Sequence, residues 1–289
     1  MPKKSPAAKR KPGNTRVTGK EQYYTPVSLA ERLLGEVSAV VPDLLTRTIL
    51  EPAGGTGSFL TAARNIGIES ILSFDIEPKH ADVAKANFLT KPLKLKNAVT
   101  ISNPPFGRNN SLSIPFFNKA ANHSDVIAFI VPRSWRKWSV INRLDRSFHL
   151  VADHDIQIDY VDDAGDELSK RTSLATCFQI WQRKDTLRPH YSVQDKKVIT
   201  KVAPELADVA LTVFGFGCGN LKTEFERKPN TTSMFLKLNH PAALAALQSV
   251  DFSRFYKNTA YTEALSIQEI NYLLNETIFG DSFLIEKVN

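Results

Sequence analysis

Glu51-Pro52-Ala53-Gly54-Gly55-Thr56-Gly57-Ser58 is the stretch that decides the fold. It follows a short apolar strand at residues 48–50 and precedes a helix predicted at 59–66. Glycines let the backbone of such a turn approach a ligand closely, which a Cβ would prevent. A strand, a glycine-rich turn and a helix in this order predict a nucleotide-like ligand at the carboxyl end of the strand.

The segments around this turn alternate between strands and helices. A helix is predicted to begin at Thr25-Pro26, where a capping residue precedes a proline suited to the first helical position. The strand and helix predictions rest on apolar runs and helical spacing. Further strands are predicted at 71–74, 98–102, 125–131, 156–160 and 173–181, and further helices at 79–86, 113–122 and 143–149. This alternation predicts a doubly wound α/β sheet.

Two acids beside the turn indicate the chemistry of its ligand. The turn lacks both the GxGxxG spacing of dinucleotide sites and the Lys-Ser/Thr of a phosphate loop. Glu51 leads the turn, and an acid suits a cationic ligand better than a pyrophosphate. The sulfonium and amino group of S-adenosylmethionine meet that requirement, so Glu51 is expected to face the methionine end. Asp75 ends the next strand and is placed to accept both ribose hydroxyls of such a cofactor.

A second motif, Asn103-Pro104-Pro105-Phe106, directly follows the strand at 98–102. The two prolines fix φ and remove two donors, so the loop is stiff. If the Asn103 oxygen and the Pro104 carbonyl accept both hydrogens of an aromatic amine, its nitrogen moves toward tetrahedral geometry and its lone pair points at a methyl donor. Asn103 is not ionisable, so this catalysis would rest on alignment and electrostatics.

These motifs and their order resemble the N6-adenine DNA methyltransferases of the gamma arrangement, over residues 21–184. In that arrangement the cofactor part comes first, the catalytic loop second and the target-recognition region last. Modification subunits of type I restriction systems and phage or solitary adenine methyltransferases are similar. The resemblance implies a Rossmann-like class I S-adenosylmethionine-dependent methyltransferase sheet with a small C-terminal α+β domain. It also implies methylation of adenine N6 in DNA after base flipping, with no metal.

Three further stretches carry the resemblance. Tyr23-Tyr24-Thr25-Pro26 is similar to a motif whose Tyr and Thr close over the methionine part of the cofactor, and residues 130–135 (IVPRSW) to the wall of the target pocket. Asn87-Phe88-Leu89 is similar to a motif whose acid contacts the cofactor adenine and whose Phe packs on it. The family usually has Asp where this chain has Asn87, which still presents a carbonyl. The implied cofactor-binding residues are Tyr24, Thr25, Glu51, Ala53, Gly54, Gly55, Asp75, Ile76, Asn87 and Phe88.

Stacking on the flipped base is expected from two aromatic rings. Phe106, the last residue of the catalytic motif, is the first of them, and the second is expected near the strand at 173–181. Trp181 is the candidate there and Phe178 the alternate. An aromatic residue on a strand more often belongs to the core, so this alternative stays open.

Other substrates also stay open. Adenine methyltransferases of ribosomal and transfer RNA share Asn-Pro-Pro-Phe, but they seldom carry the Tyr-Thr-Pro helix start. Protein glutamine methyltransferases use Asn-Pro-Pro-Tyr with a different N-terminal region. A catalytically silent methyltransferase-like binding module is disfavoured by the intact Asn103 and glycine turn. DNA is therefore the expected partner, with structured RNA as the alternative.

The chain beyond residue 184 is predicted to form a separate target-recognition domain, 185–289. Short strands are expected over 186–238, with a glycine-rich turn at 214–220, and helices at 241–249 and 265–276. A basic stretch at its start is either a solvated strand face or a phosphate-contacting ridge. It comprises Arg183, Lys184, Arg188, Lys196, Lys197 and Lys201. Asn220 and Lys222 are candidates for base or phosphate contacts.

Residues 1–20 account for the net charge of +7, because they hold seven Lys and Arg and no acid. This composition predicts a disordered basic tail, which is either a phosphate-binding arm or a solubilising segment. The sequence shows neither an apolar run long enough to span a bilayer nor a signal-peptide h-region, so a cytoplasmic protein is expected, or a nuclear one in a eukaryote. Cys177 and Cys218 lack metal-ligand spacing and are expected to be buried thiols.

Overall fold

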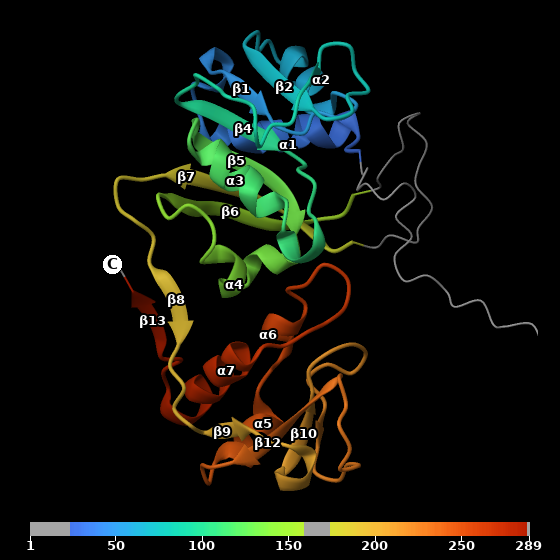
Figure 1. The fold of residues 1–289 in the computed structure, drawn as a ribbon. Helices are drawn as coiled ribbons and strands as arrows, with labels where there is room; N and C mark the ends of the chain where they lie inside the picture. The colour runs from blue at the N-terminus through green and yellow to red at the C-terminus, as the bar shows by residue number, and fades with distance from the viewer. Residues whose placement is uncertain (1–23, 159–173, 288–289) are drawn as a thin grey trace, which may run out of the picture.

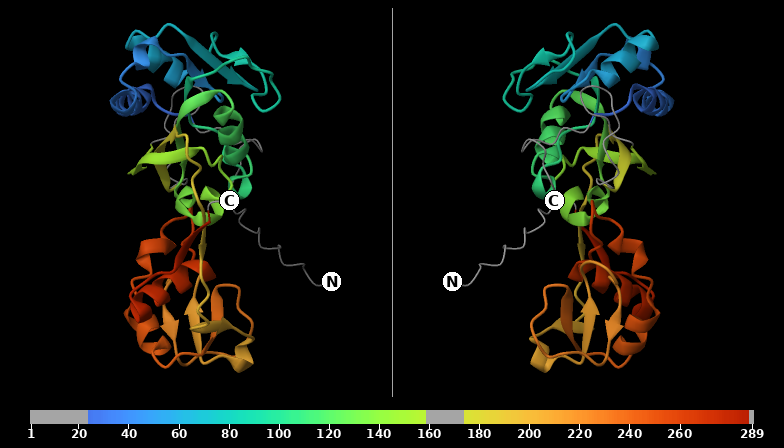
Figure 2. Two further views of the ribbon diagram at one scale, coloured as in Figure 1. Left: turned by 90° about the vertical axis from the view of Figure 1, so that its left-hand side faces the viewer. Right: turned by 90° about the vertical axis from the view of Figure 1, so that its right-hand side faces the viewer.

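The computed structural model describes residues 24–158 and 174–287 of the 289-residue chain. They form two bodies, one built on a large sheet and the other on two smaller sheets, which follow one another along the long axis of the molecule (Figures 1 and 2). The predicted basic tail and Tyr23 lie outside the described residues. Within the described ranges, no helix combines the length and the apolar character needed to cross a membrane.

The N-terminal body contains a seven-stranded sheet in the order β3-β2-β1-β4-β5-β7-β6. Its strands are β1 (Ile49–Glu51), β2 (Ile71–Asp75), β3 (Ala84–Lys85), β4 (Ala98–Ser102), β5 (Ser124–Pro132), β6 (Phe148–Ile156) and β7 (Thr176–Arg183). Strands β3, β2, β1, β4 and β5 are parallel, and β7 lies antiparallel between β5 and β6. This topology confirms the predicted Rossmann-like class I methyltransferase sheet.

Helices cover both faces of this sheet. Helices α1 (Val27–Val40) and α2 (Ser58–Asn65) pack on one face, where the helical spacing of Ala30, Leu33, Leu34 and Val37 buries all four side chains. Helix α3 (Ser113–Ala121) covers the other face. Strand β5 is apolar along almost its whole length because it is buried between these two layers.

An aromatic cluster fills the α3 side of the sheet. The Phe117 ring lies at its centre, with edge-to-face contacts at 5.5 to 6.1 Å to the rings of Phe129, Trp135, Phe148 and Trp181. Aromatic pairs in this geometry stabilise a core beyond the area that they bury. The cluster therefore anchors β5, β6 and β7 to α3.

Three of the predicted elements are wrong. Residues 79–86 form turns and the short strand β3 instead of a helix, because Ala84 and Lys85 pair with the end of β2. The helix predicted at 143–149 is replaced by α4 (Trp138–Ile141), a turn and the start of β6, because Phe148 pairs with Arg183 and fills the aromatic cluster. The strand predicted at 156–160 lies earlier, since β6 ends at Ile156; residues 159 and 160 lie outside the described residues.

The C-terminal body follows β7. Strands β9 (Ile199–Lys201), β10 (Val209–Thr212), β11 (Leu221–Lys222) and β12 (Ser233–Leu238) form an antiparallel sheet, and β8 (His190–Val193) pairs with β13 (Leu284–Lys287). The helices are α5 (Ala243–Ser249), α6 (Ser253–Tyr256) and α7 (Ile267–Phe279). A capping box between Ser266 and Glu269 starts α7, and a separate apolar core joins α5 and α7 to the sheet.

The two bodies meet at the segment that follows β5. Lys137 Nζ lies 2.8 Å from the Glu269 carboxylate at the start of α7, and Glu269 is only 2% exposed. The Trp138 ring packs at 5.5 Å against both Phe255 and Tyr272. Removal of one partner from a buried ion pair strongly destabilises the fold, because the other charge stays buried without compensation. This contact therefore fixes the C-terminal body beside the end of β5.

Candidate active site

Parallel strands bring the predicted residues to one edge of the sheet. Glu51 ends β1, Asp75 ends β2, and Asn103 follows the last residue of β4. Because β1, β2 and β4 run in the same direction, their carboxyl ends share an edge. In open α/β sheets, ligands bind outside this edge. The structure therefore brings both sequence motifs to one place.

The glycine turn is shaped by close approaches that exclude side chains. A Cβ on Gly54 would lie 2.1 Å from Ser73 Oγ. Gly55 has φ of +48°, and a Cβ there would lie 2.8 Å from the Tyr24 ring. Glycine meets both demands without steric cost. The turn thus packs closely against Ser73 on β2 and places Tyr24 directly against Gly55.

Glu51 lies beneath this turn. The side chain is 1% exposed and accepts a hydrogen bond of 2.7 Å from Ser73 Oγ. Burial, and secondarily the nearby Asp75 carboxylate, raises the pKa of Glu51 to about 8, against the hydrogen bond from Ser73, which lowers it. A pKa raised to about 8 favours the protonated form of this buried acid at neutral pH.

Asp75 links the turn to the following loop. Its Oδ2 accepts from the Gly55 N–H at 2.9 Å and its Oδ1 from the Glu77 N–H at 2.8 Å. Each carboxylate oxygen has a second lone pair for a ligand hydroxyl. Ile76, which follows, is 56% exposed and presents an apolar surface beside the acid. Asp75 and Ile76 thus lie beside the glycine turn, and their contact with a cofactor stays a prediction.

Asn87 and Phe88 differ in their surroundings. Asn87 is exposed, and its Oδ1 accepts from the Leu89 N–H at 3.0 Å. The Phe88 ring is 1% exposed and packs at 5.5 Å on Phe116 in the core. Asn87 is therefore accessible at this edge, whereas Phe88 supports the segment from below and does not present a ring face to a ligand.

The loop of residues 103–110, predicted to be catalytic, is held by amide contacts. Asn103 Nδ2 donates to Thr25 Oγ1 at 3.3 Å, which directs the amide oxygen to the other side of the group. Asn110 Nδ2 donates to Ser134 Oγ at 3.1 Å, so the loop is tied to the segment that follows β5. Trp135 Nε1 donates to Ser113 Oγ in the same region. Sequence reasoning missed Asn110, although its neighbour Asn109 makes an Asn-Asn pair typical of a left-handed turn, and both have positive φ.

The aromatic residues expected to stack on a base are buried. Trp181 is 1% exposed within the aromatic cluster, and its Nε1 donates to Gln179 Oε1 at 3.1 Å. Phe178 points to the opposite face and is also fully buried. Both belong to the core, and the prediction that either stacks on the base is wrong for that reason. Phe106 is 7% exposed and packs in the core on the α1 and α2 side of the sheet, and its stacking on a base stays a prediction.

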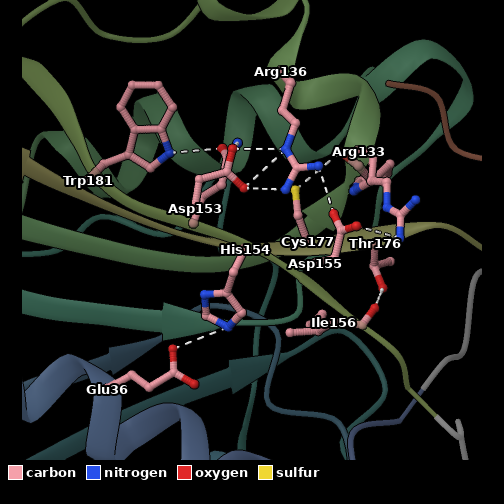
Figure 3. A network of polar contacts seen from close by, with 12 residues as sticks. Glu36, Arg133, Arg136, Asp153, His154, Asp155, Ile156, Thr176, Cys177 and Trp181 are labelled. Atoms are coloured by element: carbon pink, nitrogen blue, oxygen red, sulfur yellow. Dashed lines mark hydrogen bonds and ion pairs between the residues drawn. The ribbon is translucent and has the colours of Figure 1, made fainter. Parts of the chain in front are cut away.

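A polar network joins the end of β5 to β6 (Figure 3). Arg136 contacts Asp153 through Nε at 2.9 Å and Asp155 through Nη1 at 2.7 Å. Arg133 Nη2 also reaches Asp155, at 2.8 Å. The Asp153 side chain, the largest influence, raises the pKa of Arg136. Sequence reasoning missed this network because its members are far apart in the chain; the charged residues alternating along β6 were the only local signal.

Two members of the predicted basic ridge serve the fold. Arg183 lies over the Phe148 ring at 4.6 Å and donates to the carbonyls of Ala121 and Ser124. Arg188 is 4% exposed, and its guanidinium donates to the Leu144 and Phe148 carbonyls. Lys184, Lys196, Lys197, Lys201 and Lys222 are exposed or half-buried. A ridge formed by all six basic residues is therefore excluded.

Both cysteines are thiols, as predicted. Cys177 and Cys218 are buried and unbridged. Burial raises the pKa of the Cys177 thiol, and it raises that of Cys218 to about 11. Neither sulfur therefore presents a thiolate at neutral pH, and neither is a nucleophile for the site.

About a third of the sequence is similar to that of known methyltransferases. It is 28% identical over 95 residues to the type II methyltransferase M.HincII of Haemophilus influenzae, which is 32% of this chain and 18% of that protein. M.HindII of Haemophilus influenzae gives the same values. No family model matches the chain. The chain is thus aligned with less than a fifth of the length of these curated relatives, and they confirm the resemblance to methyltransferases.

Solved structures of methyltransferases share this arrangement loosely. The proposed RNA methyltransferase PH1948 of Pyrococcus horikoshii is 18% identical with a TM-score of 0.46, covering 59% of this chain and 91% of that one. The modification subunit of a proposed type I restriction enzyme of Vibrio vulnificus is 16% identical with a TM-score of 0.42, covering 62% and 48%. The fold assignment itself rests on the strand order given above.

The residues at this edge fit S-adenosylmethionine. Glu51 offers a buried carboxyl beneath the turn, Asp75 offers a carboxylate beside it, and a Cβ on Gly55 would fill the space against Tyr24. A cationic sulfonium, an amino group and a ribose are the groups that such donors and acceptors accommodate. S-adenosylmethionine is therefore the cofactor that the chain is built to bind, and its sheet is that of the class I S-adenosylmethionine-dependent methyltransferases.

Proposed function

We propose that the protein methylates the N6 amino group of adenine in DNA. The observation that carries this proposal is the position of Asn103 directly after β4, with its amide nitrogen held by Thr25 and the cofactor turn one strand away. When bound, S-adenosylmethionine supplies an electrophilic methyl group. Asn103 and the Pro104 carbonyl accept the two amine hydrogens and align the nitrogen lone pair for in-line attack.

The chemistry of the loop favours an amine over other acceptors. Adenine N6 is a weak nucleophile because its lone pair is delocalised into the ring. Two acceptors at fixed positions reduce that delocalisation without an ionisable base, so their contribution is electrostatic preorganisation. The stiff Pro104-Pro105 pair and the bond from Asn110 to Ser134 hold the acceptors in place.

The contact between the two bodies supports a large substrate. The C-terminal body is fixed beside the end of β5 by Lys137, Glu269 and Trp138, on the edge from which Asn103 emerges. We propose that residues 185–289 are the target-recognition domain, which holds a nucleic acid over that edge while the base is flipped. The catalytic domain would then be residues 21–184, with the chain before it contacting phosphates.

Structured RNA is the alternative substrate, because the same loop can serve adenine in either nucleic acid. Tyr24 and Thr25 both contact the proposed site, and this helix start is uncommon in the RNA enzymes. The similarity to two type II methyltransferases also favours DNA. These two observations support DNA over RNA in the proposal.

The test is to incubate the protein with radiolabelled S-adenosylmethionine and either duplex DNA or total RNA, and to identify the labelled nucleoside. Label in N6-methyladenine from DNA is the expected result. Label confined to RNA would show that RNA is the substrate instead of DNA. Label in methylcytosine would contradict the role given to Asn103. Asn122→Ala, an exposed Asn at the end of α3, is a control for the Asn103→Ala variant.

A further inference from the structure

Three aromatic side chains are exposed on two segments of the C-terminal body. Phe216 is 105% exposed, Phe214 48% and Tyr261 53%. In the described part of the chain, the exposed large apolar side chains include one further aromatic residue, Phe279. Scattered exposed apolar residues are ordinary, whereas aromatic rings exposed on neighbouring segments are typical of surfaces that contact another molecule.

The two segments that carry these rings are joined by backbone contacts. Phe214 forms a β-bridge with Ala264, and the Gly215 N–H donates to the Glu263 carbonyl at 2.9 Å. The Leu265 N–H donates to the Val213 carbonyl at 2.9 Å. The turn after β10 and the connection before α7 therefore form one surface, to which we refer as the aromatic tip (residues 214–216 and 261).

The turn holds Phe216 outward in a fixed backbone. Gly215, Gly217 and Gly219 have φ of +83°, +78° and +96°. The Cys218 N–H donates to the Gly215 carbonyl at 3.0 Å, and the Gly219 N–H to the Thr212 carbonyl at 2.8 Å. A wholly exposed ring adds no packing to this fold, and a preorganised loop lowers the entropic cost of binding a partner.

The aromatic tip is connected to the catalytic edge. The Ala264 carbonyl accepts a hydrogen bond from Lys137 Nζ, and the Ala260 carbonyl accepts from the Ala175 N–H at 2.8 Å. Lys137 follows β5 and Ala175 precedes β7, both at the edge that carries Asn103. The connection between α6 and α7 reaches toward the N-terminal body in Figure 1. A nucleic acid that places a base at Asn103 therefore lies on the face of the molecule that carries the aromatic tip.

We propose that Phe216 is a base-stacking contact for the nucleic acid substrate. This inference rests on the proposed function and deepens it. Every base offers a π face, so one ring can stack without sequence preference, and proteins that bend or open a duplex insert Phe between base steps. Lys222 is exposed on β11, the strand that follows the turn, and we propose that it contacts an adjacent phosphate.

The test compares Phe216→Ala with a matched control in the full-length protein. Leu206 is 66% exposed and lies before β10, at the opposite end of that strand from Phe216, so Leu206→Ala removes a similar exposed side chain elsewhere. A fluorescein-labelled DNA duplex is titrated with each variant. Phe216→Ala should raise the Kd by about 5- to 150-fold, the effect of one lost stacked base, and Leu206→Ala should leave it unchanged.

Phe216→Trp provides a second measurement that does not depend on loss of binding. The new indole should be quenched when duplex is added and should become protected from acrylamide. Wild type is titrated in parallel to subtract the signal of its own tryptophans, since Trp135 and Trp181 are buried but Trp138 is half-buried. An unchanged Kd for Phe216→Ala, or an indole equally accessible in the complex, would overturn the inference.

Wild-type binding separates this inference from the proposed function. A wild-type protein that binds and methylates the duplex, together with an unaffected Phe216→Ala, overturns the role of Phe216 alone. A wild-type protein that neither binds nor methylates the duplex overturns both. Cofactor affinity, measured for every variant, should be the same, because residue 216 lies in the other body.

Discussion

The two loops at the carboxyl edge of the sheet are held in different ways. The glycine turn of residues 51–58 is built around acids, with Glu51 buried beneath it and Asp75 bonded to the Gly55 N–H. The loop of residues 103–110 is held by neutral amides, through Asn103 to Thr25 and Asn110 to Ser134. Charge suits a cationic cofactor, whereas neutral acceptors suit the alignment of an amine. We therefore propose that cofactor binding and methyl transfer are divided between the two loops.

The strongest way to break this division is Asn103→Ala. The variant loses an acceptor that acts on the amine during transfer, so single-turnover methylation at saturating cofactor should fall by about 10³-fold. Asn122→Ala should be indistinguishable from wild type. A rate for Asn103→Ala within a few-fold of wild type would remove the loop from the chemistry.

Glu51→Gln tests the buried acid beneath the glycine turn. The pKa of Glu51 is raised from 4.5 to about 8, so the wild-type fold is relatively most stable below pH 4.5 and loses this contribution as pH rises to about 8. Glutamine mimics the protonated acid. The variant should therefore have the larger unfolding free energy. Its difference from wild type should grow by up to about 1.4 kcal/mol per pH unit as pH rises, and should become constant above pH 8.

Cofactor binding should move in the opposite direction in the same variant. A bound cation favours the ionised form of Glu51, so wild-type affinity should rise with pH up to about 8 and then level off. Glu51→Gln lacks this rise and binds more weakly. Calorimetric titrations between pH 6 and pH 9 measure the cofactor Kd of both proteins, because this range extends about one unit or more on either side of the Glu51 pKa. Equal pH profiles for the two proteins would contradict a cofactor contact.

Gly54→Ala should produce a smaller effect, confined to the turn. The added Cβ would lie 2.1 Å from Ser73 Oγ, the group that bonds to Glu51. Crowding of this size costs about 1–3 kcal/mol, so cofactor affinity should fall by about 5- to 150-fold. Gly35→Ala is the control, because nothing lies within 4 Å of its added Cβ on α1 and alanine favours a helix. Equal cofactor affinities for the two variants would show that the turn tolerates a side chain.

Ser134→Ala should produce the smallest effect. The substitution removes the acceptor of the Asn110 amide, and one such hydrogen bond contributes about 0.5–1.5 kcal/mol. The methylation rate should fall by about 2- to 12-fold with cofactor affinity unchanged, because the bond positions only the catalytic loop. Initial rates and calorimetric titrations check the two parts of this prediction.

The two motifs were predictable because their signals are local. Gly54 and Gly55 follow an apolar strand and precede a helix within one short stretch, and Asn103-Pro104-Pro105-Phe106 ends a strand in the same way. Steric freedom and fixed φ act on neighbouring residues, so sequence alone carries them. The doubly wound sheet followed from the same alternation of elements.

The residues that were misplaced depend on distant partners. Trp181 is in the core because Phe117 on α3 packs against it, and residues 84–85 form a strand because β2 offers an edge. Arg136 meets Asp153 and Asp155 only after β6 has paired with β7. None of these contacts leaves a local pattern, so propensity and spacing were overruled by tertiary packing.

Cofactor binding by Asp75→Ala and Asn103→Ala, titrated side by side, tests the division between the loops most directly. Asp75→Ala removes the carboxylate that accepts from the Gly55 N–H and that we propose binds the cofactor ribose. Its Kd for the cofactor should therefore rise by about 10-fold or more, since hydrogen bonds to charged groups contribute about 1.5–3 kcal/mol. Asn103→Ala should keep the wild-type Kd. A wild-type Kd for Asp75→Ala, or an equal loss in both variants, would contradict the account.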